Sequence, residues 1–398
     1  MYGLRRGALA LVCLMLVLAL APPVPKTLGQ GLYKSSKFEY YLTLAIASNS
    51  TSTSTVSFSW TVVEKFPWGK SSFTGSSKPF YDLGYMNCIE ERVSSNDPDA
   101  FRVFAWQFSL DPGEIVEVTM TFEAEAFSLK PDTITRDQVG NIGDIPRTLR
   151  QKYTNETYYW DYSSGEVANV ISEINESIGG SRNVYDIVLA VKRWITENFV
   201  YDYPYEFDYP TYRVKASELL KRTGNMTVSG RYTGVCRHLA HLAVALLRGF
   251  GVPAKYVTGW LFYQEPGNSS KILFLGFHAW VRVYIPFRNG TGTWRDVEVT
   301  TAGSPYALDI TRLGLNPYPY VYVPDYVEFY NEREEDLPNL LILDFSAGVL
   351  KKASQYQAPQ GAGGGGFFQF PALLAWSLLP TAIVIAILAK MRKARRVE

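Results

Sequence analysis

The stretch GVCRHLA, residues 234–240, decides how this chain folds, and it leads on to ALLRGFGVPAK, residues 245–255. Its apolar residues recur three and four positions apart, which predicts a helix that begins at Cys236 and ends near Phe250. A cysteine in the first turn of a helix meets unpaired N–H groups and partial positive charge, which stabilise the nucleophilic thiolate form. The same N–H groups suit the oxyanion of a tetrahedral intermediate. Cys236 is therefore the candidate nucleophile.

The stretch GFHAWVRVY, residues 276–284, supplies the candidate base. It lies within a predicted strand over residues 272–285 that is rich in β-branched and aromatic residues. Alternation along the strand places His278 on the face that also carries Trp280 and Arg282. A strand is a rigid support for a group that must keep its geometry, so His278 is predicted to accept the thiol proton.

Two carboxylates, Asp296 and Glu298, share one face of the next predicted strand, WRDVEVT at residues 294–300. Either one can orient an imidazole. If the two strands form an antiparallel hairpin, Glu298 falls opposite or diagonal to His278. Asp296 then falls further along the pair, where it can serve as an ordinary ion-pair partner of Arg282. The hairpin favours Glu298 as the acid, with Asp296 as the alternative.

These three stretches together resemble the transglutaminase-like superfamily over about residues 165–305. Residues 234–255 are similar to its nucleophile helix, residues 278–281 (HAWV) to its histidine strand and residues 294–300 to its acid strand. Three separate motifs in the right order and spacing make the resemblance specific. The family acid is usually an Asp four positions after the Trp, and Glu298 takes that place here.

The resemblance implies an α+β, papain-like core in which Cys236 is the nucleophile, His278 the base and Glu298 the acid. The superfamily includes protein cross-linking transferases, proteases, peptide amidases and inactive relatives. We therefore expect a cysteine enzyme that acts on amide bonds of proteins or peptides through an acyl-enzyme. Hydrolysis is favoured over cross-linking because water is always present and no amine-donor site is recognisable. The alternative is a catalytically silent surface module for binding or structural support.

The regions on either side of the predicted site have patterns of their own. Residues 31–130 contain several strand-like runs and are predicted to form an immunoglobulin-like β-sandwich, in which the turn at residues 111–113 joins two strands of a hairpin. In residues 150–305, helical stripes precede strands, which predicts the α+β catalytic domain. Residues 306–350 are rich in Tyr and Pro and form a C-terminal extension of the ectodomain.

Both ends of the chain carry apolar segments. Residues 1–30 are predicted to be a signal peptide or an N-terminal anchor, since two arginines precede an apolar run. Towards the other end, a Gly-rich tether at residues 351–366 leads to an apolar stretch at residues 367–389, long enough to be a transmembrane helix. The basic tail at residues 390–398 is cytoplasmic by the positive-inside rule. These features predict a cell-membrane protein whose main domains are extracellular.

Composition limits the partners of this protein. The chain has 398 residues with a formal net charge of +1, so it lacks the concentrated basic face that a nucleic-acid partner requires. The predicted partners are a protein or peptide substrate and the membrane. Sequons provide candidate glycan acceptors if the chain is exported. They begin at Asn49, Asn155, Asn175, Asn225, Asn268 and Asn289.

The cysteines and histidines leave alternatives open. A disulfide between Cys88 and Cys236, or a buried inert thiol, would replace the reactive cysteine. His278 alone would more often be a buried core histidine. Cys236, His238 and His241 form a C-x-H-x-x-H pattern with one-turn spacing, but the sequence nearby provides no fourth ligand. No metal and no cofactor is predicted.

Overall fold

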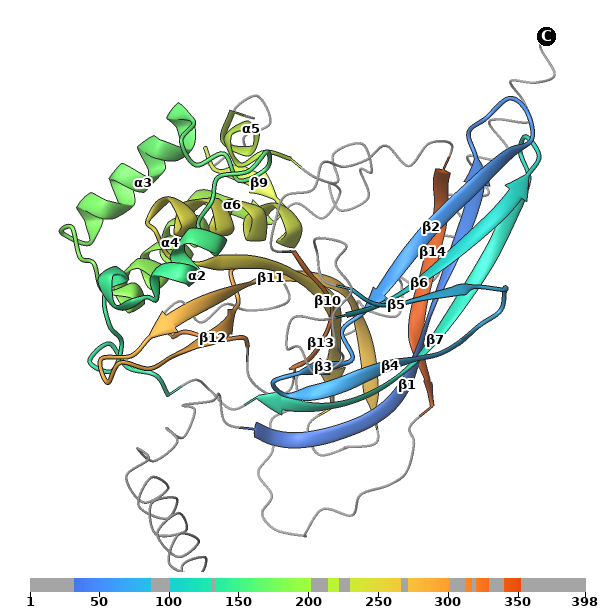
Figure 1. Cartoon of the computed structure of the whole chain (residues 1–398), viewed down its shortest axis with the longest axis horizontal. Helices are drawn as coiled ribbons and strands as arrows, with labels where there is room; N and C mark the ends of the chain where they lie inside the picture. Colours follow the sequence, from blue (N-terminus) through green and yellow to red (C-terminus); the bar gives the residue numbers. More distant parts are fainter. Residues whose placement is uncertain are drawn as a thin grey trace, which may run out of the picture. The chain divides into compact units, whose positions relative to one another are not determined.

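The computed structural model describes residues 32–86, 101–129, 133–201, 214–221, 230–265, 271–300, 312–316, 320–328 and 340–351 (Figure 1). Several predictions lie outside these residues: Cys88, two of the sequons (Asn225 and Asn268), the N-terminal segment, the Gly-rich tether, the transmembrane stretch and the basic tail. Among the residues that the structure describes, no helix combines the length and apolar character needed to cross a membrane.

The strands of the N-terminal region form two antiparallel sheets. One has the order β14-β1-β7-β4-β3, in which β14 (Leu340–Lys351) comes from much later in the chain, and the other has the order β2-β6-β5. In chain order, the strands that this region contributes are β1 (Leu32–Ser48), β2 (Ser54–Val62), β3 (Lys65–Phe66), β4 (Gly69–Ser76), β5 (Tyr81–Met86), β6 (Phe101–Leu110) and β7 (Ile115–Leu129). We call the two sheets the N-terminal sheets.

Alternating apolar residues build the core between the N-terminal sheets. Phe38 and Tyr40 of β1 are buried in one cluster with Trp106 of β6. Phe73 of β4 meets Phe104 of β6 across the two sheets, with 4.3 Å between their ring centroids. The prediction of an all-β region is confirmed, and its immunoglobulin-like type stays a prediction.

The turn at residues 111–113 corrects one expectation. It joins β6 to β7, but these strands belong to different sheets, so the predicted hairpin is wrong. The chain passes from one sheet to the other at this turn, and β6 and β7 each bury one face in the core that the two sheets share. Gly113 has a φ of 79°, which a glycine adopts without strain.

The second region combines helices with a four-stranded antiparallel sheet of order β12-β11-β10-β13, among the residues described. We call it the core sheet, and Figure 1 shows the helices gathered beside it. The helices are α2 (Arg147–Tyr153), α3 (Gly165–Ser177), α4 (Val184–Asn198), α5 (Ala216–Lys221) and α6 (Cys236–Gly249), with a 3-10 turn η1 (Ile142–Asp144). The strands that follow β7 in the chain are β8 (Phe199–Tyr201), β9 (Tyr232–Gly234), β10 (Ala254–Gln264), β11 (Ile272–Pro286), β12 (Gly292–Val297), β13 (Tyr320–Glu328) and β14 (Leu340–Lys351). β8 and β9 form a two-stranded sheet, and β14 belongs to an N-terminal sheet.

Helix α6 is the centre of this second region. It is rich in Ala and Leu, which are strong helix formers, and nearly all of its side chains are buried. It ends where the Gly251 N–H bonds to Arg248 O and the Val252 N–H bonds to Leu247 O, with Gly251 at a φ of 82°. Pro253 follows and prevents further helix. The predicted extent of this helix is confirmed.

The predicted extension, residues 306–350, contributes strands to both regions. β13 lies beside β10 at the edge of the core sheet, and β14 lies beside β1 at the edge of an N-terminal sheet. The packing of the two regions is continuous: the Phe38 ring meets Phe262 of β10 at 4.6 Å, and the Tyr40 ring meets Trp260 at 5.1 Å. The N-terminal sheets therefore support the core sheet through a shared hydrophobic core.

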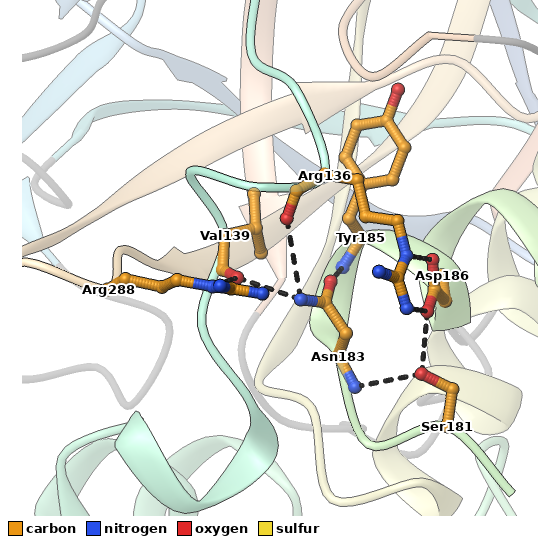
Figure 2. Close-up of polar contacts among 7 residues, drawn as sticks. All are labelled: Arg136, Val139, Ser181, Asn183, Tyr185, Asp186 and Arg288. Atoms are coloured by element: carbon orange, nitrogen blue, oxygen red, sulfur yellow. Dashed lines mark hydrogen bonds and ion pairs between the residues drawn. The ribbon is translucent and has the colours of Figure 1, made fainter.

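A polar cluster fixes the connection between the two regions (Figure 2). Asn183 caps α4 and donates to Val139 O at 2.8 Å. Arg288, beyond β11, also donates to Val139 O, and Arg136 forms a two-pronged ion pair with Asp186 at 2.7 Å. We call this set the connection cluster: Arg136, Val139, Ser181, Asn183, Asp186 and Arg288.

Candidate active site

Cys236 is the first residue of α6, as predicted. The parallel pair of β8 and β9 delivers the chain to this point, with Gly234 opposite Tyr201. Val235 has extended backbone angles, and its N–H donates to Nδ1 of His238 at 3.2 Å, which caps the helix. Cys236 is a free and buried thiol. Cys236 therefore stands in the first turn of α6, the part of a helix whose backbone N–H groups lack partners within the helix.

His278 lies in the middle of β11 and pairs with Gly259 of β10. Its imidazole interacts with the side chains of both Cys236 and Glu298, and both interactions raise its pKa. The bond to Glu298 joins Nε2 to Oε2 over 2.7 Å, so Nδ1 is the ring nitrogen left to serve the thiol. The structure thus brings the predicted nucleophile, base and acid together. We call Cys236, His278 and Glu298 the catalytic row.

Glu298 is placed by the β11–β12 hairpin and by the residues just after it. The register pairs Val281 with Val297, so Glu298 follows the end of β12 and lies diagonal to His278. Its Oε1 accepts the backbone N–H groups of Val299 and Thr300 at 3.0 and 2.9 Å. The chain therefore turns away after Val297 and orients the longer Glu side chain with its own backbone.

Asp296, the alternative acid, has other partners. Its carboxylate accepts the indole N–H of Trp280 at 2.7 Å and the Nε–H of Arg282 at 3.1 Å. The hairpin register places it directly opposite Arg282. The structure does not bring Asp296 to His278, and the ion pair with Arg282 matches the expectation from the hairpin.

The buried pair of His278 and Glu298 carries opposite charges. Burial alone would lower the pKa of His278, but the Glu298 charge and the interactions of the imidazole with Cys236 and Glu298 outweigh burial and raise this pKa to about 10. Burial alone would raise the pKa of Glu298, whereas the His278 charge and several hydrogen bonds lower it to about 2. Both side chains are therefore ionised at neutral pH, and the imidazolium can stabilise a thiolate beside it.

Sequence reasoning missed Tyr322 on β13. Its hydroxyl donates to Oε2 of Glu298 at 3.1 Å, and the side chain is buried. It comes from the extension for which the sequence suggested no role. The alternating apolar residues around it indicate a strand, but nothing in them indicates that this strand adds to the core sheet beside β10.

The two histidines of α6 each bond to a different neighbour and do not point at a common position for a metal ion. His238 accepts the Val235 N–H, and Nδ1 of His241 accepts the indole N–H of Trp160 at 2.8 Å. The His241 ring also stacks on Tyr256 with centroids 4.2 Å apart. Within the described residues, no group of three His, Cys, Asp or Glu side chains is arranged to hold a metal ion.

A thiol at a helix N-terminus, an imidazole on the adjacent sheet and a carboxylate behind it define a papain-like cysteine, histidine and acid arrangement. Residues 172–299 match the model of the transglutaminase-like superfamily. This segment spans all three residues, so the part of the chain that holds the candidate site is similar to the transglutaminase-like superfamily.

Known proteins extend the comparison. An uncharacterized protein of Mycobacterium tuberculosis is 26% identical over 180 residues, which cover 42% of this chain and 55% of that protein. One of Mycobacterium leprae is 34% identical over 73 residues, which cover 17% of this chain and 24% of the relative. The chain thus spans about half the length, or less, of these curated relatives.

A solved structure from Cytophaga hutchinsonii, named as a candidate cysteine protease, superposes with a TM-score of 0.50. The identity is 16%, and the superposition covers 84% of this chain and 96% of that one. At this identity the likeness shows the fold alone. Its coverage extends well beyond residues 172–299, so the likeness is not confined to the matched domain.

Proposed function

We propose that this protein is a cysteine enzyme that cleaves amide bonds of proteins or peptides through an acyl-enzyme on Cys236. The single observation that carries the proposal is the placement of His278, which interacts with the Cys236 side chain on one side and is hydrogen-bonded to Glu298 on the other. A core histidine held for packing alone does not need two such partners. The name of the structural neighbour from Cytophaga hutchinsonii supports the choice of peptide bonds.

The reaction follows from the charges. The Cys236 thiolate attacks the amide carbonyl carbon, and the N–H groups at the start of α6 stabilise the oxyanion. The His278 imidazolium gives its proton to the leaving amine as the C–N bond breaks, which leaves a thioester. Neutral His278 then takes a proton from water, the hydroxide attacks the thioester, and the thiolate leaves. Glu298 holds the ring and stabilises its charged form throughout.

We further propose that the reaction takes place outside the cell membrane. The apolar and basic segments of the two termini support this location. The described sequon residues agree with it, because Asn49, Asn155, Asn175 and Asn289 are all exposed. A membrane-impermeant biotin reagent applied to intact cells should label the protein without lysis. Labelling that needs lysis would place the main domains inside instead.

The decisive experiment is alkylation of the purified full chain by iodoacetamide, followed by peptide mapping. We expect fast modification of Cys236, retained in Cys88→Ser, with no Cys236 adduct in Cys236→Ala and a much slower rate in His278→Ala. Parent and His278→Ala proteins that react equally slowly at Cys236 would contradict the enzyme and support the silent surface module. A native Cys88–Cys236 disulfide would also support that module.

Hydrolysis and transfer can be separated with the same protein. A peptide substrate incubated with a fluorescent primary amine should yield mainly the free carboxylic acid if water is the acyl acceptor. Dominant incorporation of the amine, dependent on Cys236, would show a transferase. Either outcome needs the acyl-enzyme, which mass spectrometry detects as an adduct on the α6 peptide.

A further inference from the structure

Tyr322 joins the catalytic row from outside the segment that matches the family model. It lies on β13, beyond residues 172–299. Its ring packs against two aromatic rings of β11, with centroids 5.9 Å from His278 and 5.5 Å from Trp280. Its hydroxyl is separate from this packing and donates to Oε2 of Glu298 at 3.1 Å.

The same carboxylate oxygen therefore accepts two donors. Oε2 of Glu298 accepts the imidazolium N–H at 2.7 Å and the phenol O–H at 3.1 Å. Oε1 is held by two backbone N–H groups, so each oxygen of the carboxylate is held by a pair of donors. A buried carboxylate with this many donors has a strongly preferred orientation and a low affinity for a proton.

We propose that Tyr322 is a positioning residue that keeps Glu298 ionised and aimed at His278. Without the phenol O–H, the charge on Oε2 is shared with His278 alone, and the carboxylate binds a proton more readily. A protonated Glu298 no longer stabilises the imidazolium, so the thiolate loses its partner. The Tyr322 side chain is itself buried, with 1% of its surface exposed, so its effect on the reaction runs through Glu298.

The fold holds Tyr322 firmly in this position. The indole N–H of Trp68, from the N-terminal sheets, donates to the Tyr322 backbone carbonyl at 2.7 Å. Gly314 O accepts the Glu298 N–H at 3.0 Å, so the segment before β13 is tied to the residue that Tyr322 contacts. The phenol pKa is raised well above its usual value of 10, first by burial and then by Glu298, so the hydroxyl remains a donor at any working pH.

The inference rests on the proposed function for its kinetic test. Tyr322→Phe removes the hydroxyl and keeps the ring, and Tyr320→Phe on the same strand is the matched control. We expect kcat to fall about 10-fold in Tyr322→Phe with KM unchanged, and the acid limb of the pH profile to rise by about one unit, since a hydrogen bond to a charged group has about this effect. In the Glu298→Gln background, the same substitution should have no further effect.

A second readout does not need activity. The chain has three histidines, so the bridging proton of His278 can be assigned by NMR with His238→Gln, His241→Gln and His278→Gln spectra. Tyr322→Phe should shift this proton, and 3-fluorotyrosine at position 322, a stronger donor, should shift it the opposite way. If Tyr322→Phe does not fold, the fluorotyrosine protein alone decides.

The outcomes are distinguishable. An inactive parent whose bridging proton responds to position 322 overturns the proposed function and leaves the positioning role intact. An active parent with kcat, acid limb and bridging proton unchanged in Tyr322→Phe overturns the positioning role alone. A loss of Tm larger than that of Tyr320→Phe, with kinetics unchanged, would assign the hydroxyl a purely structural role.

Discussion

The connection cluster and the catalytic row are both networks of hydrogen bonds and opposite charges, but their ion pairs differ in exposure to solvent. Arg136 of the connection cluster is 61% exposed and Asp186 is 18% exposed, whereas both side chains of the His278–Glu298 pair are fully buried. The two pairs have the same N–O separation of 2.7 Å. Equal geometry thus occurs in two very different dielectric surroundings.

This difference in exposure means that charged side chains have a different role in each network. The connection cluster links segments that are distant in sequence, and Figure 2 shows most of its bonds directed at backbone atoms and at one exposed ion pair. The catalytic row isolates a few charges from water, so each remaining partner matters strongly. Substitutions of equivalent chemistry should therefore have very unequal effects in the two places.

Glu298→Gln should have the largest effect. It removes the negative charge beside His278, and an unpaired partner in a buried ion pair costs about 3–5 kcal/mol of unfolding free energy. Loss of the orienting carboxylate should lower kcat by about 10²- to 10⁴-fold. Urea unfolding and single-turnover kinetics would measure both. A variant as stable and as active as the parent would show that the pair does not act as a unit.

The pH dependence of stability should come next in size. The pKa of Glu298 is lowered to about 2, so its stabilisation is present above about 4.5 and lost as the pH falls towards 2. The pKa of His278 is raised to about 10, so its stabilisation is present below about 6.5 and lost as the pH rises towards 10. The pair therefore stabilises most between these limits.

Urea titrations across this range would test the pH prediction. The parent should lose stability on both sides of the window, and Glu298→Gln should give a flatter curve because the coupled charges are gone. Identical curves for parent and variant would mean that other groups control the pH dependence.

Gly259→Ala should have an intermediate effect. Gly259 pairs with His278, and an added Cβ would lie 2.3 Å from Val323 O and 2.8 Å from the Trp280 ring. These close contacts can be relieved only if β13 or Trp280 moves, which should lower the unfolding free energy by about 1–3 kcal/mol. Movement of either disturbs the row, so alkylation of Cys236 should slow as well.

The matched control is Gly75→Ala on β4, where the nearest atom would be at an ordinary 3.5 Å. Its unfolding free energy should stay within about 0.5 kcal/mol of the parent. Equal losses for the two alanine variants would indicate that the close approach at Gly259 relaxes without strain.

The origin of each feature decides what the sequence could predict. Cys236 was placed by the period of one helix, and the positions of His278 and Glu298 by the alternation and register of one hairpin. These are local patterns. The contact between Trp68 and Tyr322 joins residues 254 positions apart, and no local pattern encodes such a pairing. For the same reason, local patterns did not indicate that residues 306–350 supply strands to two sheets, or that β6 and β7 lie in different sheets.

Asp186→Asn should have the smallest effect, although it makes the same acid-to-amide change as Glu298→Gln. Asp186 accepts from Arg136 and Ser181 near the surface, where water replaces lost interactions. The unfolding free energy should fall by about 0.5–1 kcal/mol. The difference from the parent should shrink further in about 1 M salt, which screens exposed charges, whereas the Glu298→Gln difference should persist. If salt reduces both differences alike, the His278–Glu298 pair is not shielded from the solvent ions, and the contrast between the two networks does not hold.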